Sequence, residues 1–260
     1  MIRALWTAAT GMEAQQISQD VTANNLANIN TVGFKKARAD FQDLMYQVSS
    51  QSGAETSDGG QLPVGVEVGM GVKPVAVQKM FTQGDYMQTG NKFDWAIEGD
   101  GFFQLDNNGR TVYTRAGSFR TDKDGMLCNA EGLKLTPEIS IPEEMVHFTV
   151  DSGGTWTAAD GEGNSLATGR IELSRFINPA GLTSLGRNLY GETDASGTAS
   201  VGNSGEEGFG TISQTFLEMS NVNVVDEMVK MIVGQRAYEI NSKAIQTADS
   251  MLQMANGLKR

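Results

Sequence analysis

Apolar side chains recur at seven-residue intervals near both ends of the chain. The C-terminal series consists of Val224, Met231, Tyr238, Ile245 and Leu252. Small residues flank this series on one side, at Gly234, Ala248 and Ala255. An interval of seven residues returns a side chain to nearly the same face of an α-helix, so this pattern predicts one long helix with an apolar stripe.

The N-terminal segment has a weaker form of the same pattern. Residues 4–29 contain no proline and one glycine. The members of the seven-residue series are Leu5, Met12, Gln19 and Leu26. We therefore predict a second long helix over 4–29, with Gly33 as its C-terminal stop signal.

The start of the C-terminal helix has signals of its own. Asn223 followed by Asp226 resembles a capping box, and Asp226 and Glu227 suit the positive end of the helix dipole. A narrow apolar stripe does not offset the backbone entropy of about 1–2 kcal/mol per ordered residue, so the helix needs a partner. The N-terminal helix is the candidate within the chain. Because its stripe is narrow too, we expect neighbouring molecules to complete the core; an ordinary intramolecular helix pair lying on the middle of the chain is the alternative.

The region between the helices has the composition of an all-β domain. Of the 31 glycines, 27 lie between residues 41 and 219, as do all 5 prolines. Runs of β-branched and aromatic residues alternate there with turn signals, at a spacing that favours a sandwich or small barrel. The predicted strands are 94–98, 102–105, 112–115, 119–121, 126–128, 133–136, 146–150, 155–158 and 171–176. The fold class is α+β, with this all-β domain inserted between two long helices that form a coiled-coil-like core domain.

Two segments of the middle region, 49–61 and 192–210, are rich in Gly, Ser, Thr and acidic residues and are predicted to be flexible loops. The formal net charge of −11 argues against a nucleic-acid partner, which would require a basic face. The sequence has no run of about 18 apolar residues, so we expect no membrane insertion. It also has no secretory signal, which indicates cytoplasmic residence unless a signal-independent export route operates.

The residues available for chemistry are sparse. Cys128 is the only cysteine and His147 the only histidine, and each is interpreted as structural. The segment 122–125 superficially resembles a calcium loop but lacks the glutamate at position 12, so a hairpin turn is the better interpretation. A carboxylate dyad of the glycosidase type is the enzyme hypothesis that stays open. No catalytic residue, metal ligand or cofactor is predicted, and the chain is not expected to be an enzyme.

Three asparagines, Asn24, Asn25 and Asn28, lie close together near the end of the N-terminal helix. Asparagine is an indifferent helix former, so these amides have another purpose. They could bond across a helix–helix interface, where polar residues set the register, or cap the turn that follows the helix.

Two terminal segments resemble the rod and hook proteins of the bacterial flagellum. NNLANINTVGFKK matches their N-terminal signature with Asn25, Asn28, Thr31, Gly33 and Phe34 in place. SNVNVVDEMVKMIVGQRAYEINSKAIQTADSML resembles their C-terminal segment. Residues 96–103 and 113–119 are similar to the β-domain that these proteins share. The resemblance covers essentially the whole chain and is closest to the distal-rod branch, because 46–65 resembles the loop that marks it.

This resemblance implies a structural subunit of the distal rod that polymerises with itself into a hollow helical drive shaft carrying torque from motor to hook. It implies proximal rod and hook proteins, the surrounding outer-membrane and peptidoglycan ring proteins and the flagellar export apparatus as partners. The expected location is the periplasm-spanning rod of the basal body, reached without a cleaved signal peptide. The implied domains are an inner helical domain (1–30 and 222–260), a connecting segment (31–75 and 208–221, with flexible loop 46–63) and an outer β-domain (76–207).

A proximal rod or short hook protein of the same family is one alternative, and an extracellular β-domain binding module is an alternative of another class. The residues expected to serve polymerisation and helix packing are Leu5, Met12, Asn24, Asn25, Leu26, Asn28, Gly33, Phe34, Val224, Met228, Met231, Gln235, Tyr238, Ile245 and Leu252.

Overall fold

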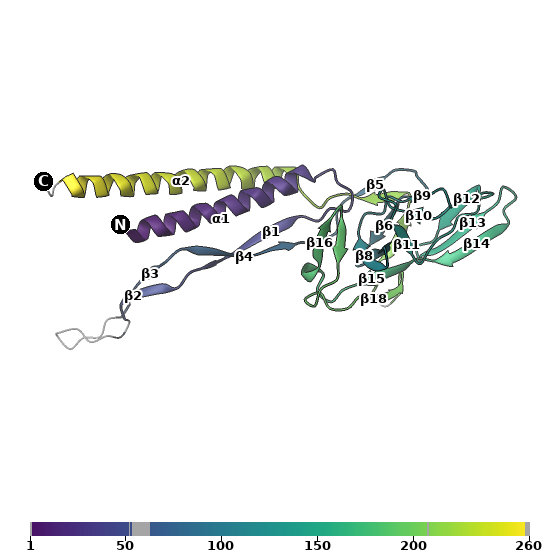
Figure 1. Ribbon diagram of the computed structural model, residues 1–260, viewed down its shortest axis with the longest axis horizontal. Coiled ribbons are helices and arrows are strands. Elements are labelled where there is room, and N and C mark those ends of the chain that lie inside the picture. The colour runs from purple at the N-terminus through teal and green to yellow at the C-terminus, as the bar shows by residue number, and fades with distance from the viewer. Residues whose placement is uncertain (1, 52, 54–62, 207, 258–260) are drawn as a thin grey trace. The chain divides into compact units, whose positions relative to one another are not determined.

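The computed structural model describes residues 2–51, 53, 63–206 and 208–257. The chain forms two compact units, each assembled from separate segments (Figure 1). The helical unit comprises residues 1–26, 37–78 and 224–260, and the β unit comprises 27–36 and 79–223. The fold is α+β, and strands make up most of its elements.

The helical unit contains the two long helices that the periodicity predicts. Helix α1 runs over Ile2–Ala27 and helix α2 over Val224–Gly257. Helix α2 begins directly after Asn223, with Asp226 and Glu227 in its first turn, as the capping signals predict. In the described part of the chain, no helix has the length and apolar character needed to cross a membrane.

The prediction that Gly33 stops the first helix is wrong. Helix α1 ends at Ala27, six positions earlier, and Gly33 lies in the β unit with a φ of +69°. A Cβ atom at Gly33 would come within 2.6 Å of the Ala116 backbone nitrogen. The glycine is therefore required by a positive φ and by a close approach of two backbones.

Four strands of the helical unit form a long two-stranded ribbon, which the sequence patterns do not predict. The strands are β1 (Ala37–Asp43), β2 (Tyr46–Ser50), β3 (Val66–Gly69) and β4 (Val72–Lys79). Strand β1 pairs with β4, and β2 pairs antiparallel with β3. The Leu44 amide donates to the Gly71 carbonyl at 2.8 Å and joins the two pairs. Most of the predicted loop 49–61 lies outside the described residues.

The β unit holds the remaining strands and one 3₁₀ turn, η1 (Pro179–Gly181). Its strands are β5 (Tyr86–Gln88), β6 (Trp95–Glu98), β7 (Phe102–Asn107), β8 (Arg110–Thr114), β9 (Arg120–Thr121), β10 (Leu127–Cys128), β11 (Lys134–Thr136), β12 (His147–Val150), β13 (Thr155–Ala159), β14 (Ser165–Arg170), β15 (Glu172–Arg175), β16 (Thr183–Gly186), β17 (Leu189–Gly191), β18 (Ser200–Asn203), β19 (Thr211–Gln214) and β20 (Phe216–Glu218).

A nine-stranded sheet with the order β16-β17-β8-β7-β11-β10-β9 organises this unit. It branches at β7, whose first two residues pair with β15, and β15 pairs in turn with β18. Strands β12, β13 and β14 form a separate sheet, and β6 and β5 pair with β19 and β20. Strand β18 lies inside the segment 192–210, so the prediction of one continuous loop there is wrong.

The two faces of β7 support two apolar clusters. Phe103 and Leu105 point into the main core around Trp95, where all three side chains are fully buried. Phe102 points to the opposite face and packs with Tyr113 and other rings in a smaller cluster. Because successive side chains of a strand alternate between faces, a single strand links both clusters.

Candidate functional site: the terminal helix pair and its exposed faces

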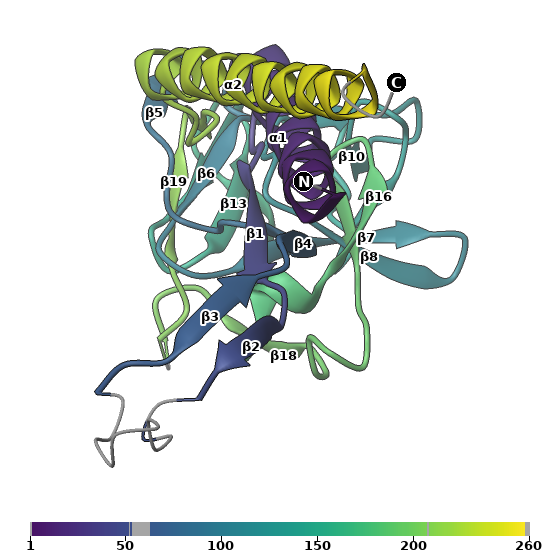
Figure 2. The ribbon, with the colours of Figure 1, turned by 90° about the vertical axis from the view of Figure 1, so that its left-hand side faces the viewer.

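Helices α1 and α2 run antiparallel within the helical unit. An ideal Cβ at Gly11 would lie 3.0 Å from the Asn241 side chain, and one at Gly234 would lie 3.4 Å from Gln19. The helix axes are inclined to each other rather than parallel (Figure 2). Small residues at these crossing points let the two backbones approach closely.

Asn25 and Glu227 form the polar end of this helix pair, and each is 1 % exposed. The Asn25 amide nitrogen donates to a Glu227 carboxylate oxygen at 3.1 Å and to the Ala37 carbonyl at 2.9 Å. Its amide oxygen accepts the Ala37 amide at 2.8 Å. Lys230 donates to the other Glu227 oxygen at 2.6 Å. One asparagine thus bonds to α2 and to the start of β1.

The predicted apolar series of α2 is only partly covered. Met231, Ile245 and Leu252 are half-buried, whereas Val224 and Tyr238 are exposed. Met228 and Gln235, the other predicted α2 residues, are exposed too. The most buried positions form a second seven-residue series interleaved with the first: Glu227, Gly234, half-buried Asn241, and Ala248. The small residues Gly234 and Ala248 are visible in the sequence pattern, whereas Glu227 suits only the helix dipole there and Asn241 has no apolar signal that marks it as buried.

The N-terminal residues of the predicted set divide between the two units. Leu5, Met12 and Leu26 are half-buried on α1, where Ala8, Ala14 and Thr22 are the buried neighbours. Asn24 is exposed on the same helix.

The other three predicted N-terminal residues, Asn28, Gly33 and Phe34, lie in the β unit. The Asn28 side chain accepts the Thr31 hydroxyl at 3.2 Å in the turn after α1. Phe34 is buried beneath the Lys79 ammonium, 4.7 Å from the ring centre. Burial lowers the pKa of Lys79. These residues therefore belong to the packing of the β unit.

A broad apolar face of α2 points away from α1. The residues of this outer face are Val225, Val229, Ile232, Val233 and Ile240, and each is more than half exposed. They recur at intervals of three, four and seven or eight residues, which places them on one side of the helix. A helix that is apolar on two opposite sides is typical of one buried between neighbours.

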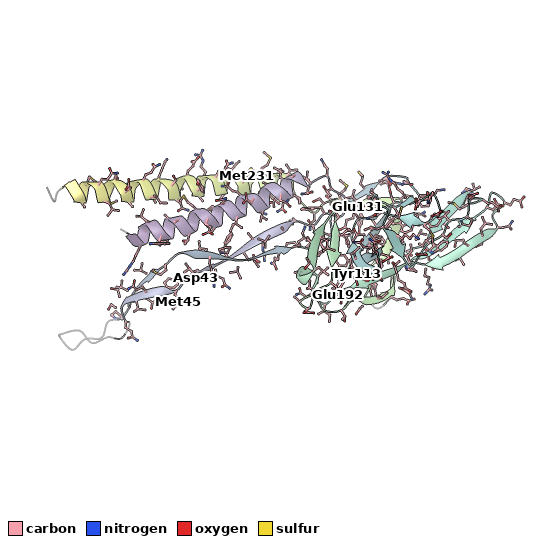
Figure 3. The ribbon with its side chains drawn as sticks, viewed as in Figure 1. Asp43, Met45, Tyr113, Glu131, Glu192 and Met231 are labelled. Carbon is pink, nitrogen blue, oxygen red and sulfur yellow. The ribbon has the colours of Figure 1, made fainter. Side chains whose placement is uncertain are left out.

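The ribbon exposes apolar side chains as well. Met45 is 86 % exposed (Figure 3). Tyr46 is 54 % exposed, and a hydrogen bond with the Asp43 carboxylate raises the pKa of its phenol. Exposed valines continue along all the later strands of the ribbon, at Val48, Val66, Val68, Val75 and Val77. Hydrogen bonds from Asn25 to Ala37 and from the Val72 amide to Thr10 join one side of the ribbon to α1, and the exposed apolar side chains are suited to packing against a further surface.

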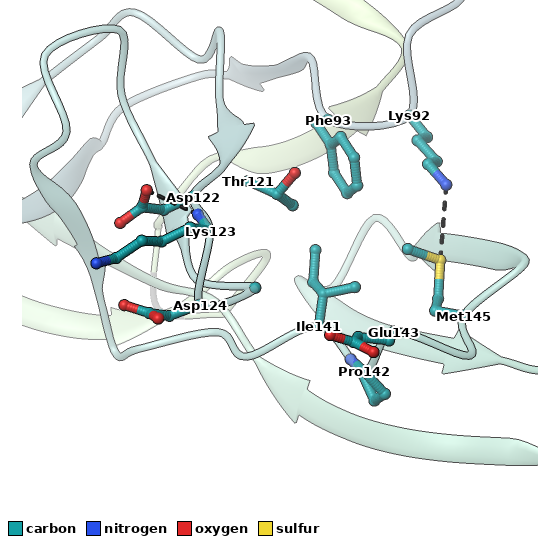
Figure 4. Close-up of a pocket in the computed structure, with 11 residues that line it drawn as sticks. Lys92, Phe93, Thr121, Asp122, Lys123, Asp124, Ile141, Pro142, Glu143 and Met145 are labelled. Carbon is teal, nitrogen blue, oxygen red and sulfur yellow. Dashed lines mark hydrogen bonds between the residues drawn. The ribbon is translucent and has the colours of Figure 1, made fainter.

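The β unit contains an open pocket around the turn that superficially resembles a calcium loop (Figure 4). Asp122, Asp124 and Glu143 border it, and Lys92 reaches Met145 across one side. The Gly125 amide donates to the Asp122 carbonyl at 3.0 Å, which confirms the predicted hairpin turn. Among the described residues no group of three or more His, Cys, Asp or Glu side chains could hold a metal ion.

Cys128 is buried in β10, and burial raises the pKa of its thiol. The prediction of a small core residue is confirmed. His147 is exposed on β12, opposite Ala159.

Three families of flagellar proteins match the chain. The family described as "Flagella basal body rod protein" matches residues 5–35. That described as "Flagellar hook protein FlgE/F/G D1 domain" matches residues 96–158. That described as "Flagellar basal body rod FlgEFG protein C-terminal" matches residues 213–258. Both helices and strands β6 to β13 of the β unit thus have the sequence pattern of a rod or hook subunit.

Relatives that match over the full length show which kind of rod or hook subunit the chain resembles. The chain is 49 % identical over 264 residues to the flagellar basal-body rod protein FlgG of Borreliella burgdorferi, covering 100 % of both chains. It is 44 % identical over 261 residues to FlgG of Caulobacter vibrioides, covering 99 % of this chain and 100 % of the relative. It is 39 % identical over 266 residues to FlgG of Bacillus subtilis, covering 100 % of both. The chain belongs to the FlgG family of flagellar basal-body rod proteins.

The predicted resemblance to the rod and hook family, and to its distal-rod branch, is confirmed. The chain is a structural subunit of the bacterial flagellar distal rod. Its relatives are named as rod proteins and not as enzymes.

Proposed function

We propose that copies of this chain polymerise through the outer face of α2 and the exposed side chains of the ribbon. The observation that carries this proposal is the outer face itself, where Ile232 and Val233 are 56 % and 61 % exposed. Each apolar side chain of this size stabilises by about 1.5–3 kcal/mol when it is fully buried. A neighbouring subunit is the partner that a rod protein has in every turn of its polymer.

In the polymer, the helices of successive subunits would form a coiled-coil-like inner core, and the β unit would form the outer domain. The division into inner, connecting and outer domains given above is part of this proposal. The proposed contact would be heterologous, with the outer face of α2 meeting a different face of the next subunit, because such contacts generate helical assemblies. The polymer would act as a non-enzymatic drive shaft across the periplasm. The proximal rod and hook proteins would be its axial neighbours, the ring proteins would surround it, and the flagellar export apparatus would deliver it.

The test is a matched pair of charge substitutions in α2. Ile232→Asp would bury an unpaired carboxylate in each subunit contact, whereas Thr247→Asp places the same charge on an exposed polar position of the same helix. We expect Ile232→Asp to abolish polymer, measured by electron microscopy of isolated basal bodies, while the circular dichroism of the β unit is unchanged. Thr247→Asp should assemble normally. Wild-type rods in the Ile232→Asp strain would contradict the proposal.

A further inference from the structure

The β unit contains a buried ionic cluster built on Glu218. This carboxylate is fully buried, and its two oxygens accept from Lys35 Nζ at 2.6 Å and Arg115 Nε at 2.7 Å. The oxygen that binds Lys35 also accepts the Gly84 backbone amide at 3.0 Å. Lys35 is itself fully buried and donates to the Thr82 carbonyl at 2.7 Å.

Backbone carbonyls complete the coordination of Arg115. Its guanidinium donates to the Gly101 carbonyl, to the Gly99 carbonyl at 2.5 Å and to the Gln83 side chain at 3.1 Å. Two cations therefore share one carboxylate in the interior. Burial lowers the pKa of Lys35, Glu218 opposes this change, and Arg115 reinforces it.

A buried ionic cluster is a poor source of stability. Removing charges from water costs several kcal/mol per ion, and well-packed apolar residues often serve stability equally well. Such a cluster instead fixes the geometry of the segments that it joins, because each donor must meet one particular acceptor. Here the carbonyl acceptors Thr82, Gly99 and Gly101 belong to two different loops, so the cluster specifies how these loops are arranged.

Three residues of the cluster lie in the β unit, close in sequence to the points where the chain enters or leaves it. Lys35 comes two residues before β1 of the helical unit, Thr82 follows β4 by three residues, and Glu218 precedes α2 by six. All three connecting segments therefore leave or enter the β unit next to the same carboxylate.

Hydrogen bonds tie these three segments to one another within the β unit. The Gly33 amide donates to the Glu218 carbonyl at 2.8 Å, and the Met80 amide donates to the Lys36 carbonyl at 2.8 Å. The Asn221 side chain accepts the Lys36 amide at 2.8 Å and donates to the Met80 carbonyl at 2.9 Å. The segments are thus joined side by side before each continues into the helical unit.

We propose that Lys35, Arg115 and Glu218 are positioning residues that clamp the three connecting segments into one rigid base. Torque that enters the β unit through these segments then acts on one rigid base and not on three independent segments. This inference rests on the proposed function, since it assumes a subunit that carries load inside a polymer.

The test uses Lys35→Met and Glu218→Gln, with Arg187→Met as the matched control. Arg187 pairs with Glu131 at 3.1 Å on the surface of the same unit. Two readouts on the purified full chain separate the clamp from general stability: hydrogen exchange at the Gly33, Lys36 and Met80 amides, and melting of the Trp95 core. Removing one partner of a buried ion pair destabilises the whole unit, so the Trp95 core should still melt in a single transition but at a lower temperature. At these three amides we expect at least a tenfold loss of protection beyond that at amides of the Trp95 core, in both variants. Arg187→Met should change neither the amide protection nor the melting of the Trp95 core.

In cells, we expect Lys35→Met to assemble rods but to lose motor torque selectively at high viscous load, and Lys35→Arg to restore it at least in part. A loss of protection no greater than that at amides of the Trp95 core, wild-type torque at high load, or unfolding of the whole Trp95 core would each overturn the inference. Failure of the proposed function is distinguishable, because it would appear as normal polymer in the Ile232→Asp strain, whatever the amides at residues 33, 36 and 80 do.

Discussion

Asn25 and Glu227 are hydrogen-bonded at 3.1 Å across the helix pair although 202 positions separate them in the chain. Both side chains are buried, so the amide replaces the water that each group would otherwise bind. The same amide also pairs with the Ala37 backbone, in the manner of a neighbouring strand. Through these hydrogen bonds, Asn25 of α1 joins helix α2 to the first residue of the ribbon.

Asn25→Ala should destabilise the helical unit. The substitution leaves the Ala37 backbone groups and a Glu227 oxygen without their buried partner, which costs roughly 2–3 kcal/mol. The measurement is thermal unfolding followed by the helical circular dichroism signal. Gln16→Ala, at an exposed position of α1, is the control and should have little effect. Equal melting of the two variants would show that the hydrogen bonds contribute nothing.

Ile245→Asp should separate the helices without affecting the β unit. Ile245 is half-buried in the seam of α2, so an aspartate there would hold a poorly hydrated charge against α1. We expect loss of helical signal and of polymer, with the tryptophan fluorescence of the β unit preserved. Gln246→Asp, at the exposed neighbouring position, should assemble. If both variants assemble, the seam assignment fails.

Gly33→Ala should destabilise the β unit more than Gly90→Ala does. Both glycines have a positive φ, +69° and +71°, so both substitutions carry the same backbone strain of about 1 kcal/mol. Only at Gly33 does the new Cβ also meet the Ala116 backbone, at 2.6 Å, whereas nothing lies within 4 Å at Gly90. Urea unfolding of the two variants measures the difference. Equal losses of stability would mean that the close approach relaxes at no cost.

Tyr113 should make the β unit sensitive to alkali. Burial, reinforced by Glu192, raises the pKa of its phenol from 10 to about 12 (Figure 3). The folded state thus holds the phenolic proton more tightly than the unfolded state does. The resulting stability is complete below pH 10 and is lost as the pH rises through about 12.

The check is urea unfolding at about pH 8 and about pH 11 for the wild type and Tyr113→Phe. The phenylalanine variant should lose less stability between the two values. Burial also raises the pKa of Tyr86 to about 12. Its contribution to the loss of stability should therefore be similar in the wild type and in Tyr113→Phe. A pH dependence identical in both proteins would contradict the assignment to Tyr113.

The regular elements near the ends and in the β unit follow from local patterns. Helix α1 covers Ile2–Ala27 against a predicted 4–29, and β7 and β13 lie within two residues of their predicted bounds. The ribbon between Ala37 and Lys79 was not predicted. Its strands are mostly exposed and lack a clear alternation of buried and exposed residues, which is the pattern that indicates a strand in a sequence. Its pairing depends on partners that periodicity does not reveal.

The polar contacts of the candidate site were not predictable in the same way. The asparagine cluster indicated a bond across a helix interface, but nothing local identifies Glu227 as the partner of Asn25. Glu227 instead suited the helix dipole, which is a property of its own segment. Likewise, Lys35 and Glu218 lie 183 positions apart, so their pairing exists only in the folded β unit.

The proposed polymer depends above all on the outer face of α2 being a contact between copies of this chain. The most direct measurement replaces Ile232 with a photo-crosslinking amino acid during protein synthesis and irradiates isolated basal bodies, with the same replacement at Thr247 as the control. We expect a ladder of dimers, trimers and larger products of this chain from position 232, in much higher yield than from position 247. Monomer alone at position 232, or crosslinks only to a different protein, would contradict it.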